Sequence, residues 1–159
     1  MTNHQISVLT PAECSAAQLR QFHELVISGG QVQADGLVER IASAALLAFA
    51  YSGEELAGVA SVKQQKRNYV TGVFLKAKVP RLAEKYLFEI GYAVTHENFR
   101  RRGISRELIG ALISHKPGTQ FYATTKNDGM RDLLTRSGFK KTGNSWLNVN
   151  EETLDLYTN

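Results

Sequence analysis

The chain has 159 residues, of which 43% are hydrophobic and 21% charged, and this composition excludes a disordered or fibrous protein. Its 19 Lys and Arg outnumber its 15 Asp and Glu, and the formal net charge of +4 favours phosphate-bearing partners without choosing among nucleotides, cofactors and nucleic acid. The single cysteine, Cys14, excludes an internal disulfide and a four-cysteine zinc site.

Length and termini predict one soluble domain over residues 1–159. Residues 1–5 lack the basic start and apolar run of a signal peptide, and the longest apolar run, residues 41–51, is too short to cross a bilayer. The four histidines have no metal-ligand spacing. We therefore expect a cytoplasmic protein without a metal site or a membrane partner.

The first half of the chain alternates between strand and helix patterns. Strands are expected where β-forming residues gather between turns, over residues 6–9, 46–51 and 56–63. Helices are expected where apolar residues recur at helical spacing, over residues 10–29 and 35–44. Thr10 and Glu13 have the spacing of a capping box, which predicts that the first helix begins there.

Basic and apolar residues alternate irregularly over residues 66–85, and a short helix is expected around residues 69–77. A segment of this length between strands is typical of a lid or a substrate loop. The basic clusters at residues 63–67 and 76–85 also leave a nucleic-acid-binding domain open as an interpretation.

The clearest strand of the sequence covers residues 86–95. Its alternation places Glu89 on the face opposite to Phe88, Ile90 and the other bulky side chains. Four more elements are expected after it: a helix that begins near Ile104 and is stopped by Pro117 and Gly118, a strand over 119–125, a helix over 128–137, and a closing hairpin from 139–146 with 154–158. Local hairpins together with helical crossovers predict an α+β fold around a mixed sheet.

The turn between that strand and the next helix has the features of an anion site. A helix N-terminus exposes unpaired N–H groups and the positive end of the helix dipole. Arg100, Arg101 and Arg102 add cationic donors, and Gly103 and Ser105 are small where an anion would approach the backbone. These residues predict a cradle for a pyrophosphate. The chain contains neither a Gly-Lys-Ser/Thr phosphate loop nor a G-x-G-x-x-G fingerprint.

At these residues the sequence resembles the GNAT superfamily of acyl-CoA-dependent N-acetyltransferases. The family signature R/Q-x-x-G-x-G/A matches residues 100–105, with Ser105 in place of Gly or Ala. The family pattern N-x-x-A-x-x-L-Y-x-K-x-G-F resembles residues 127–139, where Met130 replaces the usual Ala and Leu134 the usual Tyr. The order of the expected elements resembles the family over nearly the whole chain.

The resemblance implies a GNAT-like fold, in which helices flank a central, mixed, mostly antiparallel and splayed β-sheet. It implies that acetyl-CoA is the co-substrate, with its pyrophosphate on the backbone amides of residues 101–105. The pantetheine arm would pair with the main chain of residues 93–95, where a backbone N–H near Val94 would polarise the thioester carbonyl, and Asn127 would help to position the arm. The implied cofactor-binding residues are Ala93, Val94, Thr95, Arg100, Arg101, Arg102, Gly103, Ile104, Ser105 and Asn127.

The implied reaction is direct attack of an amine on the thioester. An amine with a pKa of about 10.4 is protonated at neutral pH, so a base must remove a proton. Glu89 is the candidate base because it is the only carboxylate on the expected strand, and the histone-acetylating branch of the family has a catalytic glutamate at this position. The family's usual tyrosine acid falls at Leu134, which leaves Tyr122, Tyr157 or a water as proton donor.

Two interpretations of the site therefore stay open beside nucleic-acid binding. The leading one is an N-acetyltransferase that acts on an amine of a small molecule, a peptide or an aminoacyl group. The alternative is a non-catalytic acyl-CoA-binding or regulatory module, which Leu134 favours. The resemblance also leaves a homodimer open as the assembly.

Overall fold

The computed structural model describes residues 4–159. The prediction that residues 1–5 form no signal peptide therefore falls partly on residues outside the described range. The chain divides into two compact units. The first contains the described residues up to Lys63 together with Ile90–Pro117, and the second contains Gln64–Glu89 and Gly118–Asn159. The single domain over residues 1–159 stays a prediction.

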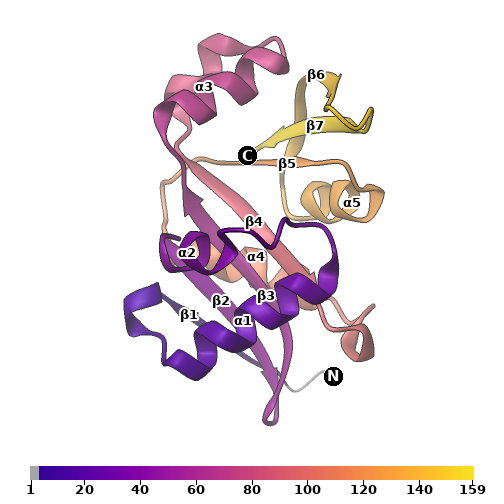
Figure 1. Cartoon of the computed structure of the whole chain (residues 1–159). Coiled ribbons are helices and arrows are strands. Elements are labelled where there is room, and N and C mark those ends of the chain that lie inside the picture. The colour runs from indigo at the N-terminus through magenta and orange to yellow at the C-terminus, as the bar shows by residue number, and fades with distance from the viewer. Residues whose placement is uncertain (1–3) are drawn as a thin grey trace. The chain divides into compact units, whose positions relative to one another are not determined.

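Within residues 4–159, seven strands form a sheet in the order β1-β2-β3-β4-β5-β7-β6 (Figure 1). Their bounds are Gln5–Leu9 for β1, Leu46–Ser52 for β2, Glu55–Gln64 for β3, Phe88–Thr95 for β4, Phe121–Thr125 for β5, Lys140–Leu147 for β6 and Thr153–Thr158 for β7. The β1–β2, β2–β3, β5–β7 and β6–β7 pairs are antiparallel, whereas β4 and β5 are parallel. The expected mixed, mostly antiparallel sheet is confirmed.

Helices connect these strands, as the sequence predicted. Their bounds are Pro11–Glu13 for η1, Ala16–Gly29 for α1, Leu37–Ala42 for α2, Arg67–Lys76 for α3, Pro80–Lys85 for η2, Glu97–Phe99 for η3, Ile104–His115 for α4 and Asp128–Arg136 for α5, where η marks a 3-10 helix. No helix within the described residues has the length and apolar content needed to cross a membrane.

The predicted start of the first helix is wrong. The capping box at Thr10 exists, because the Glu13 carboxylate accepts a hydrogen bond from the Thr10 amide at 2.9 Å, but it caps only the short turn η1. The helix α1 begins after Ser15, whose hydroxyl accepts from the amide of Gln18 at 3.1 Å. Two capping boxes in succession thus divide the predicted helix into two elements.

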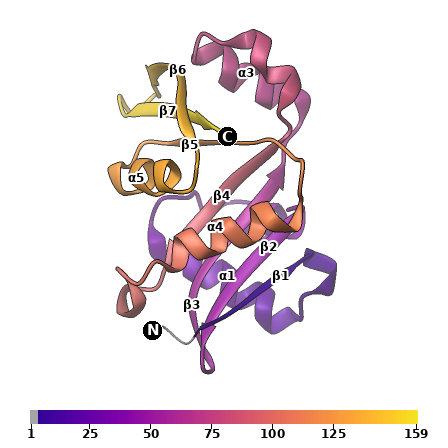
Figure 2. The ribbon, with the colours of Figure 1, turned by 180° about the vertical axis from the view of Figure 1, so that it is seen from behind.

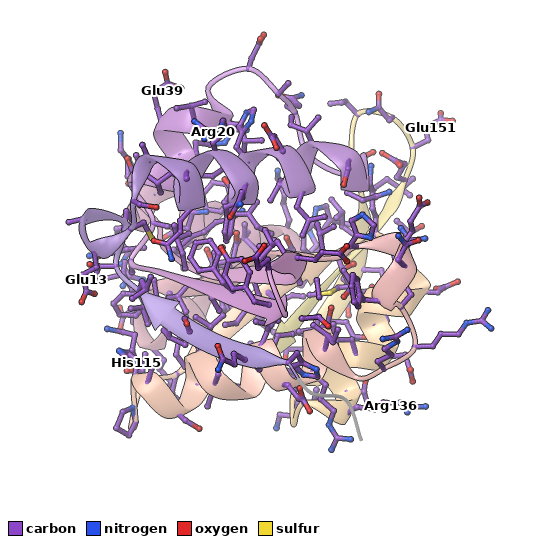
Figure 3. The ribbon with its side chains drawn as sticks, turned by 90° about the horizontal axis from the view of Figure 1, so that it is seen from below. Glu13, Arg20, Glu39, His115, Arg136 and Glu151 are labelled. Atoms are coloured by element: carbon purple, nitrogen blue, oxygen red, sulfur yellow. The ribbon has the colours of Figure 1, made fainter. Side chains whose placement is uncertain are left out.

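In the first unit, α1 and α2 cover one face of the strands and α4 covers the other (Figures 1 and 2). The core under α1 and α2 is aromatic: the ring of Phe22 meets Phe49 edge-on at 5.5 Å and Tyr92 at 6.3 Å. The helix α4 buries its apolar stripe, Ile104, Leu108, Ile109 and Leu112. Polar side chains of this unit, such as Glu13 and Glu39, project outward (Figure 3).

The helix α4 lies so close to β3 that only glycine fits at position 58. A Cβ on Gly58 would lie 2.8 Å from Ile104 Cγ2 and 3.2 Å from Leu108 Cδ1. We predict that Gly58→Ala lowers the free energy of unfolding by about 1–3 kcal/mol, because the helix must move to relieve the overpacking. Urea denaturation measures this loss. Gly72→Ala, where a Cβ would meet no atom within 4 Å, is the control and should not destabilise the chain.

In the second unit, α3 packs on the sheet through an aromatic cluster. The ring of Phe74 stacks on Tyr86 at 5.2 Å and meets Tyr122 edge-on at 5.5 Å. The guanidinium of Arg67 donates to the carbonyl oxygens of Ala83 and Tyr86, which ties the start of α3 to the end of η2. The predicted short helix near residues 69–77 is confirmed, and η2 is an additional element.

A charged network joins α5 to the β6–β7 hairpin in the same unit. The carboxylate of Asp155, on β7, accepts hydrogen bonds from Arg131 Nε at 2.8 Å and from the Ser145 hydroxyl. Burial alone would raise the pKa of Asp155, but these hydrogen bonds and the charges of Lys141 and Arg131 outweigh it, and the pKa is lowered. A lowered pKa in the folded state means that the ionised carboxylate stabilises the fold.

The lowered pKa of Asp155 predicts that the fold is less stable in acid. The contribution of Asp155 is fully present above its unfolded-state pKa of about 3.9 and is lost as the pH falls through the lower folded-state pKa. Asp155→Asn should therefore cost about 1–3 kcal/mol at neutral pH, and the gap to the wild type should close in acid. Denaturant titrations from neutral pH to acid measure the gap. The exposed Asp132, paired with Arg136 at 3.0 Å, supplies the control Asp132→Asn, which should change stability by less than about 1 kcal/mol at every pH.

Candidate active site

The strand β4 is regular only as far as Gly91. Tyr92 has a φ of 50°, which is rare for a bulky side chain and interrupts the alternation that the sequence predicts through Thr95. Neighbours hold this conformation: Ser61 Oγ donates to the carbonyl oxygen of Gly91 at 3.0 Å, and Lys63 Nζ lies 3.9 Å from the centre of the Tyr92 ring.

The predicted phosphate cradle forms one continuous turn between β4 and α4. Arg101 and Gly103 both have positive φ angles, 65° and 75°, which coil the backbone ahead of the helix. Gly103 is the N-cap of α4, and no side chain caps the first turn. A Cβ on Gly103 would meet no atom within 4 Å, so the space above this turn is open. An uncapped helix start beside open space can accept an anion.

The three arginines of the turn are exposed and, within residues 4–159, none of them forms an ion pair. The guanidinium of Arg102 lies 5.3 Å from the centre of the Phe99 ring, which itself packs against His96 at 5.8 Å. Arg102 is thus held by a cation–π contact, whereas Arg100 and Arg101 keep their full donor capacity.

Ser105, the departure from the Gly or Ala of the resembled signature, has a local explanation. Its hydroxyl lies 2.7 Å from Thr95 Oγ1, so the two side chains hydrogen-bond across the turn and link the end of β4 to the first turn of α4. Glu107, the acidic residue of that first turn, contacts the ring of His4. The serine therefore fits the turn and contributes to its shape.

Glu89, the candidate base, lies in the second unit and is a buried residue that is only 4% exposed. Gln65 Nε2 donates to Glu89 Oε1 at 3.3 Å, a contact that no sequence signal predicted. Glu89 pairs with Tyr122 across the parallel strands β4 and β5. Burial, followed by the nearby charge of Glu89, raises the pKa of the Tyr122 phenol far above its ordinary value. A fully buried phenol that ionises so reluctantly is a poor candidate for the proton donor.

Asn127 and Leu134 have structural roles in the second unit. Asn127 is the N-cap of α5, and its side-chain oxygen accepts from the amide of Met130 at 3.0 Å. Leu134 is fully buried, and Tyr157, the other tyrosine considered as an acid, is 6% exposed on β7. Within residues 4–159, no group of three or more His, Cys, Asp or Glu side chains is placed to hold a metal ion.

A mostly antiparallel open sheet, in which one strand leads through a glycine turn into an uncapped helix start, defines the class of protein: an α+β domain with helices flanking a mixed sheet. The chain belongs to the acetyltransferase (GNAT) family, whose family model matches residues 17–139. That match includes the cradle, Glu89 and the segment from Asn127 to Phe139, as the sequence resemblance implied.

Solved structures share the fold over almost the whole chain. Arabidopsis thaliana NAA60, whose crystal structure contains acetyl-CoA, superposes with a TM-score of 0.70 at 14% identity, covering 98% of this chain and 99% of that one. Escherichia coli ElaA and an acyl-CoA N-acyltransferase from Pseudomonas aeruginosa each give a TM-score of 0.69 at 13% identity, with 98% and 99% coverage. No curated protein sequence matches the chain significantly.

Proposed function

We propose that the protein is an acetyl-CoA-dependent N-acetyltransferase that transfers an acetyl group to an amine by direct attack. Family membership supports acetyl transfer, and the observation that carries the cofactor assignment is the open, uncapped start of α4 at Gly103. Bound acetyl-CoA would supply an acetyl group activated as a thioester.

The turn fits a pyrophosphate in charge and in shape. The backbone amides of residues 101–105 would bind the phosphate oxygens, and Arg100 and Arg101, which have no ion pairs among the described residues, would add charge-assisted hydrogen bonds. The main chain of Ala93, Val94 and Thr95, which follows the irregular Tyr92, would bind the pantetheine arm. In this arrangement a backbone N–H near Val94 would polarise the thioester carbonyl.

Glu89 would act as the base. The acceptor enters as an ammonium ion, and Glu89 takes up its proton through one water, so that a neutral nitrogen attacks. The hydrogen bond from Gln65 supports this role because it fixes one carboxylate oxygen and orients the side chain. Asn127 would contribute its amide nitrogen to the cofactor arm while its side-chain oxygen caps α5. The departing thiol has a pKa of about 8.5, so a water suffices as its proton source.

The second candidate is an acyl-CoA-binding or regulatory module without catalysis. Two observations favour it: a buried leucine, Leu134, occupies the family's tyrosine position, and Glu89 is itself almost fully buried. A carboxylate in this setting also suits a purely structural role.

Calorimetry with acetyl-CoA and a thiol-release assay over a panel of amines and peptides separate these functions. The enzyme predicts cofactor binding together with thiol release that depends on the amine. Cofactor binding without turnover on any acceptor would establish the module, and no binding at millimolar acetyl-CoA would exclude both.

A further inference from the structure

The segment that forms α3 and η2 carries the strongest positive charge of the chain. Residues 66–85 contain six cations and one acid, Glu84, a formal charge of +5 that exceeds the +4 of the entire chain. Figure 1 shows this segment as a helical layer at one end of the second unit. We call its exposed cations the basic face: Lys66, Lys76, Lys78, Arg81 and Lys85.

The cations of the basic face differ from most other cations of the second unit in their lack of ion pairs among the described residues. Arg67, the sixth cation, is different, because its guanidinium binds the carbonyl oxygens that join α3 to η2. The five others form no ion pair within residues 4–159. Elsewhere in the unit most cations are paired: Lys126 with Glu152, Arg131 with Asp128 and Asp155, Arg136 with Asp132, and Lys141 with Asp155. Unneutralised charge is thus concentrated on one segment.

Folding alone does not account for this concentration. The inner side of α3 is already filled by Val70, Val73 and Phe74, which pack on the aromatic cluster. A cation in the last turn, Lys76, complements the helix dipole, but like charges within a Debye length of about 10 Å repel one another. A negatively charged partner that offsets this repulsion between the cations explains why the basic face exists.

The chemistry of the basic face favours an acidic polypeptide over nucleic acid. Four of its five cations are lysines, whereas bidentate phosphate recognition favours arginine. Leu75, next to Lys76, is 57% exposed and offers an apolar contact. Within residues 66–85, Tyr69 is the only aromatic side chain that is not buried, so the segment has no series of stacking platforms for bases.

The basic face begins one residue after Gln65, the hydrogen-bond partner of the candidate base Glu89. Gln65, whose side chain contacts Glu89, immediately precedes Lys66 in the same unit. We infer that the basic face docks an acidic, partly apolar polypeptide that supplies the amine to be acetylated. Docking follows from the face itself, and the role of the polypeptide as acceptor rests on the proposed function.

Fluorescence anisotropy in the absence of acetyl-CoA tests the docking. The probe is a fluorescein-labelled peptide of alternating Glu and Leu, compared with a Ser–Leu peptide of equal length and a single-stranded RNA of equal formal charge. We expect binding of the Glu–Leu peptide that weakens as salt rises. The proposal is overturned if the Glu–Leu peptide does not bind. It is also overturned if the RNA binds to the basic face more tightly than the Glu–Leu peptide does.

Charge-matched variants locate the interaction. Lys76→Gln with Lys78→Gln should weaken peptide binding about 3- to 10-fold, since each exposed ion pair contributes modestly. The control, Arg20→Gln with Lys140→Gln, removes two exposed charges outside the basic face, Arg20 being on α1 (Figure 3), and should leave binding within about twofold. Equal losses in both variants contradict a specific face. Circular dichroism and acetyl-CoA affinity, unchanged in both variants, exclude misfolding.

The acceptor role has a separate measurement. With acetyl-CoA, the unlabelled Glu–Leu peptide should be acetylated with a higher kcat/KM than the Ser–Leu peptide, and the Lys76→Gln, Lys78→Gln variant should raise KM without lowering kcat. Docking without preferential acetylation overturns the acceptor role alone. If acetyl-CoA itself does not bind, the proposed function fails while the docking result stands.

Discussion

Glu89→Gln is expected to lower kcat by about 10²- to 10⁴-fold while leaving acetyl-CoA affinity unchanged. The amide keeps the size of the carboxylate, and its oxygen can still accept the hydrogen bond from Gln65, but it cannot take up a proton. Steady-state kinetics with a saturating amine, together with calorimetry of cofactor binding, measure the two quantities separately.

The matched control is Glu84→Gln, which removes an exposed carboxylate of η2 in the same unit and should leave kcat unchanged. A fall in kcat confined to Glu89→Gln identifies the base. An undiminished kcat in Glu89→Gln would show that this carboxylate is structural and that another group removes the proton.

Gly103→Ala should weaken acetyl-CoA binding by about 5- to 30-fold. A residue with a Cβ costs about 1–2 kcal/mol in the left-handed conformation that Gly103 adopts at a φ of 75°, so the turn relaxes and its amides no longer converge. The added methyl group also enters the open space in which we place the pyrophosphate. Calorimetric titration with acetyl-CoA measures the loss.

Gly110→Ala is the companion substitution on the same helix. Position 110 is exposed, a Cβ there would meet no atom within 4 Å, and its φ is not positive. The substitution should stabilise α4 by about 0.5–1 kcal/mol without changing cofactor affinity. Equal affinities for both variants would place the cofactor away from the turn.

The cradle shows how far local sequence signals reach. Arg100, Gly103 and the apolar stripe of α4 lie within a few turns of one another, so their spacing predicts both the start of the helix and the chemistry of the turn. The strands β2 and β3, expected over residues 46–51 and 56–63, were predicted for the same reason, since β-forming residues and turn residues are neighbours in the chain.

Other parts of the site depend on residues that are distant in sequence. The positive φ of Tyr92 is held by Ser61 and Lys63, and the Glu89 carboxylate is oriented by Gln65, 24 residues away. No local pattern predicts these contacts, because the side chains become neighbours only when β3 and β4 enter the same sheet.

For this protein, the sequence by itself determined the element types, the mixed sheet and the glycine turn at the start of α4, because propensity, capping and periodicity act over a few residues. Only the tertiary structure decided where α1 begins, how β4 departs from regular geometry and which partner Glu89 has. It also showed that the charge excess belongs to an unpaired face on α3 and η2 as well as to the cradle arginines. Whether a charge is neutralised depends on its distance from an opposite charge. Folding sets this distance, and the order of residues along the chain does not predict it.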